Sequence, residues 1–254
     1  MPLRMLLQTA YTRVIEALPH RPKCDDAVGQ QYDIFVYGAV MSDTVLPAGE
    51  TGAAGLVIPE EPFALFAQWM SDAEAGEIND PNAMTVATAT ADGKPSARTI
   101  LLKGVDGANT PSRGFVFYTN LESRKGLELA NNPHVALLFY WKSLRRQIRI
   151  EGPSTPVPDA EADAYFNSRP RGSRVGAWAS DQSRPLTDRQ ALIERVEAAQ
   201  QRFAEGEVPR PAHWSGYRVV PDRIEFWREG EFRLHDRLVF ERSGARWQTH
   251  RLFP

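Results

Sequence analysis

Basic and hydroxyl side chains gather where an expected strand gives way to an expected helix. The segment reads Thr119, Asn120, Leu121, Glu122, Ser123, Arg124 and Lys125. A helix N-terminus offers free N–H groups and the positive end of the helix dipole, so cations there disfavour the helix unless an anion lies between them. The segment therefore predicts a phosphate site, with a solvated run of charges as the alternative.

A second cluster of the same chemistry surrounds Pro170, where Tyr165, Arg169, Arg171 and Ser173 lie close together in the sequence. A tyrosine hydroxyl, a guanidinium and a serine hydroxyl can jointly hold an anion. The 30 basic residues comprise five lysines and 25 arginines. Arginine supplies planar, bidentate donors that suit phosphate, although a coding preference for arginine explains the same count.

Arg98 and Lys103 flank four residues of an expected strand, Thr99-Ile100-Leu101-Leu102. Successive side chains of a strand alternate between its two faces, so Arg98 and Lys103 are expected on opposite faces unless a bulge intervenes. One of the two side chains is then expected to bind a phosphate, and the other to contact a different chemical group. The alternative is a pair of ordinary charges at the ends of a strand.

Near the C-terminus, Trp227 is followed by Arg233-Leu234-His235-Asp236-Arg237. His235 is the histidine best placed to handle a proton, because arginines bracket it and an aspartate adjoins it. The alternative is a surface histidine beside a hairpin. Two anion sites, a flat aromatic ring and one histidine together indicate a phosphorylated planar cofactor and a phosphorylated substrate.

The elements that must position these residues are mostly short strands. Apolar segments between turn signals predict strands at 83–90, 95–103, 114–119, 135–141, 147–151, 217–220, 224–227, 237–240 and 247–252. Helices are expected at 62–75, 123–130, 158–167 and 188–203. Asp92-Gly93 marks a hairpin, and Ser123 is the expected N-cap. The pattern predicts a mainly β protein, an antiparallel barrel with appended helices.

Composition and missing motifs exclude several classes of protein. The 254 residues are 42% hydrophobic and 24% charged with a net charge of −2, which favours a folded core and disfavours a nucleic-acid binder. The longest apolar run, Val135 to Trp141, is too short to cross a membrane. The chain lacks the Gly-x-Gly-x-x-Gly, P-loop and Gly-x-Ser-x-Gly motifs, which disfavours Rossmann proteins, P-loop nucleotidases and α/β-hydrolases.

Cys24 is the one cysteine and the five histidines are scattered, so neither a disulfide framework nor a metal site is expected. The cysteine count fits a reducing compartment, and we expect a cytoplasmic protein. Residues 42–60 are rich in Gly, Ala and Pro, as in a linker. We therefore expect residues 1–58 to be a loosely ordered extension before a domain at 59–254. Met41 is an alternative start of the protein.

Several uncommon motifs occur in one order along the chain. They are Pro81-Asn82-Ala83-Met84, Arg98 to Lys103, Tyr118 to Lys125, Arg146-Gln147, Tyr165 to Ser173, Gly176-Ala177-Trp178, Gln182-Ser183, Glu225-Phe226-Trp227, Arg233 to Arg237 and Arg251-Leu252-Phe253-Pro254. From about Pro62 to Pro254 the sequence resembles the pyridoxamine 5′-phosphate oxidase family.

The resemblance implies an FMN-binding split β-barrel that works as a homodimer, with a C-terminal dimerisation region and FMN at the subunit interface. It also implies oxidation of pyridoxamine or pyridoxine 5′-phosphate to pyridoxal 5′-phosphate. Molecular oxygen is the acceptor, hydrogen peroxide is a product, and the amine substrate releases ammonia. The implied role is in vitamin B6 biosynthesis and salvage.

The resemblance further implies a role for each motif residue. FMN is assigned to Arg98, Thr99, Ile100, Leu101, Leu102, Lys103, Tyr118, Thr119, Arg124, Lys125, Gln147, Gln182, Ser183, Trp227 and Arg237. The substrate is assigned to Lys103, Tyr165, Arg169, Ser173, Arg233, Leu234 and His235. Arg233 and His235 are the implied catalytic pair. The alternatives are another flavin enzyme on the same barrel, such as a flavin reductase or phenazine-pathway oxidase, and a non-catalytic carrier of FMN or pyridoxal phosphate.

Overall fold

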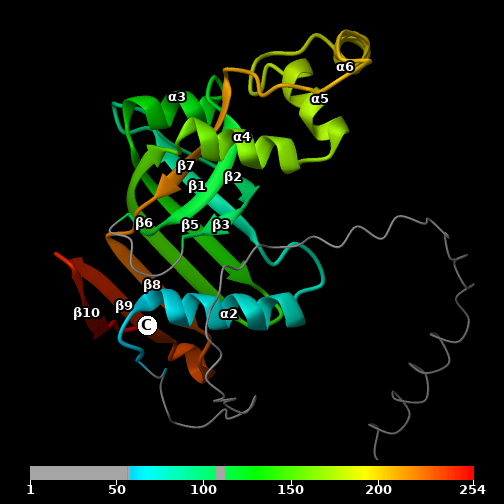
Figure 1. The fold of residues 1–254 in the computed structure, drawn as a ribbon. Helices are drawn as coiled ribbons and strands as arrows, with labels where there is room; N and C mark the ends of the chain where they lie inside the picture. Colours follow the sequence, from blue (N-terminus) through cyan, green and yellow to red (C-terminus); the bar gives the residue numbers. More distant parts are fainter. Residues whose placement is uncertain (1–55, 57, 107–111) are drawn as a thin grey trace, which may run out of the picture. The chain divides into compact units, whose positions relative to one another are not determined.

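The computed structural model describes residues 56, 58–106 and 112–254 (Figure 1). Most of the extension expected at residues 1–58 lies outside the described residues. Leu56 is the exception, because its side chain is buried in the main core. Its N–H donates to Asp236 at 2.6 Å, and its carbonyl accepts from Arg251 at 2.8 Å. The packed part of the chain therefore reaches back to Leu56.

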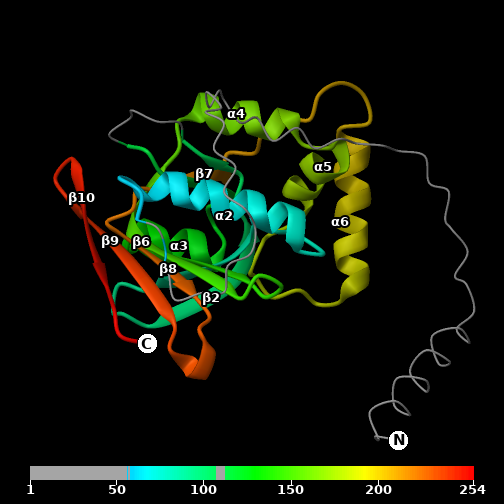
Figure 2. The ribbon, with the colours of Figure 1, turned by 90° about the horizontal axis from the view of Figure 1, so that it is seen from below.

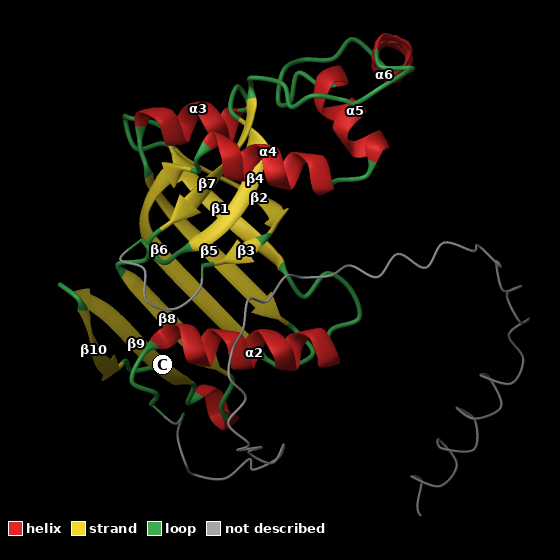
Figure 3. Ribbon diagram, viewed as in Figure 1, coloured by secondary structure: helices red, strands yellow, loops and turns green. Residues whose placement is uncertain are grey.

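Figure 3 shows that strands dominate this part of the chain and that helices surround them. The helices are α2 (Pro62–Gly76), α3 (Arg124–Asn131), α4 (Asp159–Ser168), α5 (Arg171–Ala179) and α6 (Arg189–Arg202), with a short 3-10 helix at Glu231–Arg233. The strands are β1 (Ala83–Ala89), β2 (Pro95–Leu101), β3 (Gly104–Val105), β4 (Phe115–Asn120), β5 (His134–Trp141), β6 (Arg146–Pro156), β7 (Trp214–Val219), β8 (Arg223–Arg228), β9 (Asp236–Ser243) and β10 (Arg246–Arg251).

The strands close into an antiparallel barrel because the chain passes from one sheet to the other at two places, between β2 and β3 and within β6. β2 leads directly into β3, which pairs with β4, and β4 pairs with β7. The last residues of β6 pair with β7, while its earlier residues pair with β5 and β8. Since β5 pairs with β1 and β1 with β2, the circuit is complete. β8, β9 and β10 continue outward from β6.

Strand register separates an apolar inner face from a polar outer face. On the inner face, Val86, Leu137, Ile150, Ile224 and Phe240 are successive partners across five strands. All of them are fully buried. The neighbouring outer row reads Thr85, Leu138, Arg149, Glu225 and Val239. Because side chains alternate along each strand, the outer face carries the charged groups that the core excludes.

Two helices lie at opposite ends of the barrel strands (Figures 1 and 2). At one end, α2 packs Phe66 against Phe115 and Phe139 at ring distances of 4.9 and 5.4 Å. At the other end, α3 begins at Ser123, whose hydroxyl accepts from the N–H of Gly126 as an N-cap.

The prediction of a mainly β barrel with appended helices is confirmed, but three local expectations were wrong. β2 ends at Leu101, so Lys103 does not share a continuous strand with Arg98 and the argument from alternation does not apply. Lys103 instead donates its N–H to the carbonyl of Val116 on β4. β6 extends to Pro156, five residues beyond the expected end at Glu151. The short strand β3 had no sequence signal.

Helix α5 was also missed, because it opens with Arg171-Gly172-Ser173, residues of modest helix propensity. Packing against α6 stabilises it, since both helices contribute to a separate apolar cluster that contains Val175, Ala179, Ala199 and Phe203. Among the residues that the structure describes, no helix has the length and apolar character needed to span a membrane.

Candidate active site

A buried lysine forms the centre of the first polar group, which we call the α3 cluster (Thr119, Ser123, Lys125 and Gln182). The Nζ of Lys125 donates to Gln182 at 2.7 Å, to Thr119 at 2.9 Å and to Ser123 at 3.3 Å. The N-capped start of α3 places Lys125 at the end of β4, where Thr119 lies. Sequence positions 119 and 125 are thus brought into direct contact, as the sequence predicted.

Lys125 is 7% exposed, and each of its hydrogen-bond acceptors is neutral. Burial, helped by the positive charge of Arg98, lowers the pKa of Lys125 to about 8. A buried cation with neutral partners is costly and is stabilised by an anion. The α3 cluster therefore fits a phosphate group.

Two further cations lie beside this cluster. Arg98 on β2 donates to the hydroxyls of Thr88 and Ser96 at 2.6 and 2.5 Å. Arg124 donates through Nε to Glu128 at 2.9 Å, and Glu128 also accepts from Arg98 at 3.4 Å. Arg98, Arg124 and Lys125 thus form one basic region, in which Glu128 is a buried counter-charge.

The second group, which we call the α5 cluster, consists of Lys103, Tyr165, Arg169 and Ser173 near the junction of α4 and α5. Tyr165 stacks on Tyr118 of β4 with ring centroids 3.9 Å apart. Arg169 lies over the ring of Trp214 at 4.8 Å, and Trp214 is parallel to both tyrosines. The aromatic stack fixes the direction of the Arg169 side chain.

The Nη1 atom of Arg169 is buried and has no hydrogen-bond partner among the described residues. Burial lowers the pKa of Arg169, and burial together with the Arg169 charge lowers that of Lys103. The N-terminus of α5 adjoins these cations and lacks a side-chain cap. Unpaired cationic donors beside free helix N–H groups suit an anion. Ser173, in the first turn of α5, completes the predicted set.

The third group, which we call the β8–β9 cluster, consists of Gln147, Trp227, His235 and Arg237. Gln147, Trp227 and Arg237 are successive partners across β6, β8 and β9, so their side chains share the outer face. The His235 ring lies 4.6 Å from the Trp227 ring, and its Nδ1 accepts from the N–H of Gly230 at 3.3 Å.

The turn that carries Arg233 and His235 has an uncommon backbone. Phe232 and Arg233 have φ values of 55° and 65°, in the left-handed region that non-glycine residues rarely adopt. A Cβ at Gly230 would lie 1.9 Å from the carbonyl oxygen of Leu234, so only glycine fits there. Phe232 and Leu234 are 90% and 71% exposed. Strain of this kind is concentrated at functional sites.

The structure brings the predicted residues into these three groups but does not unite the groups. β2 and β8 are separated by β1, β5 and β6 in the sheet. Four inter-strand spacings amount to about 19 Å. The β8–β9 cluster also faces outward from a curved sheet, so the curvature does not bring it closer to the α3 cluster. Trp227 on β8 therefore lies four strands away from Arg98 on β2 along the sheet.

The remaining predicted residues differ in their surroundings. Thr99 is exposed, Ile100 and Leu101 are half-buried, and Leu102 is buried beside the core. Ser183 is exposed, with a φ of 72°, and lies next to Gln182. The sequence reasoning missed Glu128 and Trp214. The spacing of four residues between Arg124 and Glu128 was a usable signal for an ion pair on a helix.

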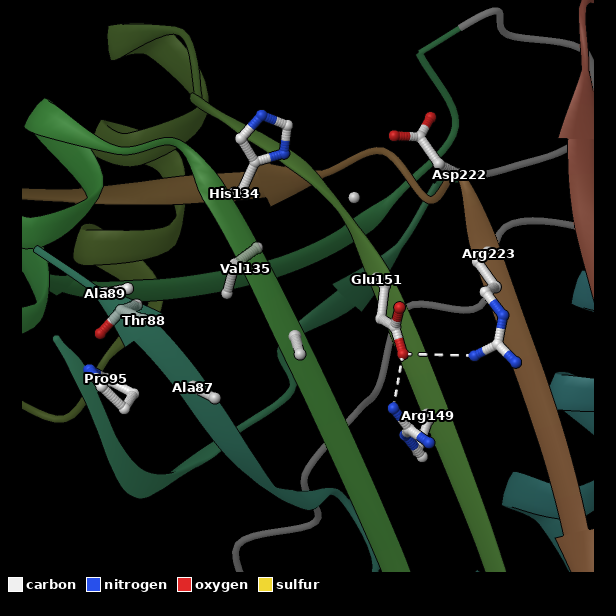
Figure 4. Close-up of a pocket in the computed structure, with 12 residues that line it drawn as sticks. Ala87, Thr88, Ala89, Pro95, His134, Val135, Arg149, Glu151, Asp222 and Arg223 are labelled. Carbon is white, nitrogen blue, oxygen red and sulfur yellow. Dashed lines mark hydrogen bonds and ion pairs between the residues drawn. The ribbon is translucent and has the colours of Figure 1, made fainter. Parts of the chain in front are cut away.

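A hollow of about 540 Å³ also opens on the outer face, between β1, β5, β6 and β8 (Figure 4). Its floor includes Ala87 and Val135, and its rim includes Glu151. Glu151 is paired with Arg149 at 2.8 Å and with Arg223 at 3.3 Å. None of the residues predicted for a cofactor or substrate lines this hollow, although Thr88 on its wall also accepts from Arg98.

Two family models match most of the described chain. Residues 70–203 match the family model described as "Pyridoxamine 5'-phosphate oxidase". Residues 214–254 match "Pyridoxine 5'-phosphate oxidase C-terminal dimerisation region". The chain belongs to the pyridoxamine 5′-phosphate oxidase family. The family resemblance noted in the sequence is thereby confirmed, and the chain is an oxidoreductase with a split-barrel fold that carries the family's dimerisation region.

Curated relatives within the oxidase family are close. A "Pyridoxine/pyridoxamine 5'-phosphate oxidase" of Gluconobacter oxydans (strain 621H) is 65% identical over 194 residues, covering 76% of this chain and 94% of the relative. The enzyme of the same name from Caulobacter vibrioides (strain NA1000 / CB15N) is 58% identical over 212 residues, covering 84% and 93%.

Solved structures show the same fold. PhzG from Burkholderia lata 383, in complex with tetrahydrophenazine-1-carboxylic acid, matches with a TM-score of 0.72 and 34% identity, covering 80% of this chain and all of that one. A pyridoxamine 5′-phosphate oxidase-related, FMN-binding protein from Nostoc punctiforme PCC 73102 matches with a TM-score of 0.59 and 16% identity, covering 75% and 96%. The second match supports the fold alone.

Proposed function

We propose that the chain is an FMN-dependent oxidase of pyridoxamine 5′-phosphate and pyridoxine 5′-phosphate, which it converts to pyridoxal 5′-phosphate. Oxygen accepts the electrons and leaves as hydrogen peroxide, and the amine substrate also releases ammonia. The names of the curated relatives support the substrate. We also propose that residues 59–254 form the oxidase domain and that the protein is cytoplasmic.

The observation that carries the proposal is that Nη1 of Arg169 has no hydrogen-bond partner in the described part of the chain. A buried guanidinium N–H without an acceptor is costly, and a phosphate oxygen would satisfy it. Lys103 and Tyr165 are near enough to Arg169 to shift or share its electrostatics, and Ser173 lies in the first turn of the adjoining α5, so these residues hold the substrate phosphate in this proposal. A phosphorylated substrate explains the α5 cluster better than a phenazine carboxylate does, because several cationic and hydroxyl donors suit three phosphate oxygens.

The α3 cluster fits the phosphate of FMN for a related reason, since Lys125 is a buried cation with neutral partners. Arg98, Arg124, Lys125 and Thr119 hold this phosphate, and Gln182 and Ser183 lie beside it. The segment from Thr99 to Lys103 and Tyr118 continue the flavin site. When bound, FMN supplies a two-electron acceptor that oxygen can regenerate.

Homodimerisation completes the site in this proposal. Gln147, Trp227 and Arg237 share one face of the sheet and together contact the flavin ring whose phosphate the other subunit holds. The separation of β2 from β8 in the sheet supports this, because the fused rings of one flavin do not span it. A twofold-symmetric dimer then has two equivalent sites, each assembled from both chains.

Arg233 and His235 act at the substrate ring. Arg233 stabilises negative charge that develops on the ring oxygen of the substrate or on the reduced cofactor. His235 orients the substrate or accepts its proton, and its contact with Trp227 fixes the imidazole. Arg169 and Lys103 supply binding energy far from the reacting carbon, which positions that carbon for reaction.

The test is an assay of the purified, FMN-loaded protein with each phosphorylated substrate in air. The expected result is formation of the aldehyde together with peroxide. Flavin binding without either product would leave the carrier alternative, and turnover of a phenazine precursor alone would favour the activity suggested by the PhzG match. Absence of flavin binding would contradict the cofactor assignment.

A subunit-complementation experiment tests the composite site. Arg169→Ala and His235→Ala chains, each impaired as a homodimer at low substrate concentration, are co-expressed with different tags and the heterodimer is purified. One of its two sites then carries both substitutions and the other carries neither, so about half of the wild-type activity per dimer is expected. A heterodimer as impaired as its parents would show that both residues serve one site from one chain.

A further inference from the structure

The side chain of Glu128 is an unusual feature of the α3 region because it is a carboxylate placed beside a site that fits an anion. It lies on the last turn of α3 and is 5% exposed. One oxygen, Oε2, accepts from Thr88, from Ser96 at 2.6 Å and from Arg98 at 3.4 Å. The other, Oε1, accepts from Arg124 at 2.9 Å.

Glu128 is ionised throughout the neutral range. Burial alone would raise its pKa, but hydrogen bonds from Ser96, Thr88 and Arg124 outweigh burial and hold the pKa at about 2. A buried ion pair is seldom the most stabilising choice, since an apolar side chain of similar size often packs as well. The carboxylate therefore calls for an explanation other than the stability of the fold.

The hydrogen-bond pattern supplies that explanation. The Arg98 guanidinium is fixed by four donations, through Nη1 to the carbonyl of Val86 and the hydroxyl of Thr88, and through Nη2 to Ser96 and Glu128. Arg124 donates to Glu128 through Nε, while its side chain is 61% exposed. A planar guanidinium fixed at Nε has its Nη groups fixed in direction, ready for a bidentate contact with a phosphate.

We propose that Glu128 is a positioning residue for the phosphate of the cofactor, acting through Arg124 and Arg98. The inference rests on the proposed function, in which these arginines hold the FMN phosphate. Two effects of opposite sign compete at this residue. Its negative charge repels the phosphate, but the three nearby cations offset that charge, while loss of the carboxylate frees a long exposed arginine to rotate. Fixed orientation is the larger effect, so removing Glu128 weakens FMN binding.

The experiment compares FMN with riboflavin, which has the same ring system without the phosphate. Binding of each to the flavin-free dimer is measured by quenching of flavin fluorescence. Glu128→Gln should raise the Kd for FMN about tenfold and change the Kd for riboflavin less than about twofold, since a lost charge-assisted hydrogen bond is of that size. Glu194→Gln, an exposed glutamate on α6, is the matched control and should change neither.

A double-mutant cycle identifies the route of the effect. In an Arg124→Ala background, Glu128→Gln should have a clearly smaller effect on the FMN Kd, because the group it orients is gone. An FMN Kd that is unchanged or lower in Glu128→Gln would overturn the proposal, as would equal weakening for both flavins. If wild-type protein binds neither flavin, the proposed cofactor fails rather than the role of Glu128.

Should Glu128→Gln fail to fold, Arg124→Lys provides a second test at an exposed position. Lysine keeps the positive charge but lacks the planar group that Glu128 orients. The positioning role predicts a weaker FMN complex with riboflavin binding unchanged, and wild-type FMN affinity in this variant would show that orientation is unimportant.

Discussion

The α5 cluster and the β8–β9 cluster are built in opposite ways. Arg169 is held by an aromatic stack, and its buried Nη1 donor has no partner among the residues that the structure describes. Arg233 and His235 instead lie on a strained turn beside the exposed side chains of Phe232 and Leu234. The α5 cluster is thus packed within one chain, whereas the β8–β9 cluster is bordered by exposed apolar side chains that a second subunit could cover. The contrast indicates that the proposed substrate phosphate site is built within one chain, whereas we expect the proposed catalytic pair to act in the assembled dimer.

The largest expected effect on activity comes from a substitution in the α5 cluster. Arg169→Ala removes the charged donor of the proposed substrate phosphate site, so kcat/KM should fall about 100-fold, mostly through KM. FMN content and the flavin spectrum should stay normal, which absorbance of the purified protein checks. The matched control is Arg189→Ala, an exposed arginine at the start of α6. A colourless Arg169→Ala protein would mean that the residue serves the cofactor instead.

His235→Ala should act on rate rather than on binding. Loss of the proposed orienting or proton-accepting group is expected to slow flavin reduction by the substrate at least about tenfold. Stopped-flow measurement of flavin absorbance under anaerobic conditions separates this step from reoxidation. The thermal midpoint should be nearly unchanged, because His235 is only half-buried. Reduction at the wild-type rate would make His235 a bystander and would weaken the contrast between the clusters.

The pH dependence of FMN affinity tests the α3 cluster. The pKa of Lys125 is lowered to about 8, so the flavin-free protein loses this charge as pH rises through that value. The phosphate dianion of FMN binds the protonated lysine, so the Kd for FMN should be nearly flat between about pH 7 and 8 and rise toward about tenfold per pH unit above that. Riboflavin, and FMN with a Lys125→Arg variant, should show no such rise. A parallel rise for both flavins would place the titrating group elsewhere.

The smallest effect is expected at the tip of the hairpin between β1 and β2, at a residue that belongs to none of the three clusters. Gly93 has a φ of 86° and open space around its Cα. Gly93→Ala should therefore lower the free energy of unfolding by about 1 kcal/mol through backbone strain alone. Urea denaturation measures this, and the FMN Kd and kcat should match wild type. A change in either would show that the hairpin communicates with the site.

Local chemistry made much of this molecule predictable. Gly93 marked a turn, Ser123 marked a helix start, and the hydroxyls and cations at 119–125 do meet around one buried lysine. The misses have a common cause. Nothing near Arg98 or Lys103 shows that the chain leaves β2 after Leu101, because the partner that draws it away is β4. Glu128 likewise has its hydroxyl partners on β1 and β2, about 30 to 40 residues away in sequence.

The domain boundary at residue 59 and the roles of the site residues stay predictions. The three clusters could be recognised from spacing and residue type, but their separation could not. It depends on the strand order, which places β1, β5 and β6 between Arg98 and Trp227. Sequence motifs name the residues expected to bind a ligand, but they do not show which of those residues come from the same subunit.

β6 is paired with β5, β7 and β8 along its length, with no intervening loop. Deleting a single residue there would turn Gln147 toward the interior and Ile148 toward water, and would misalign both neighbouring sheets at once. Changes in chain length during evolution or engineering are therefore confined to the connections on either side, such as 142–145. The register of β6 therefore sets the register of the three strands that pair with it.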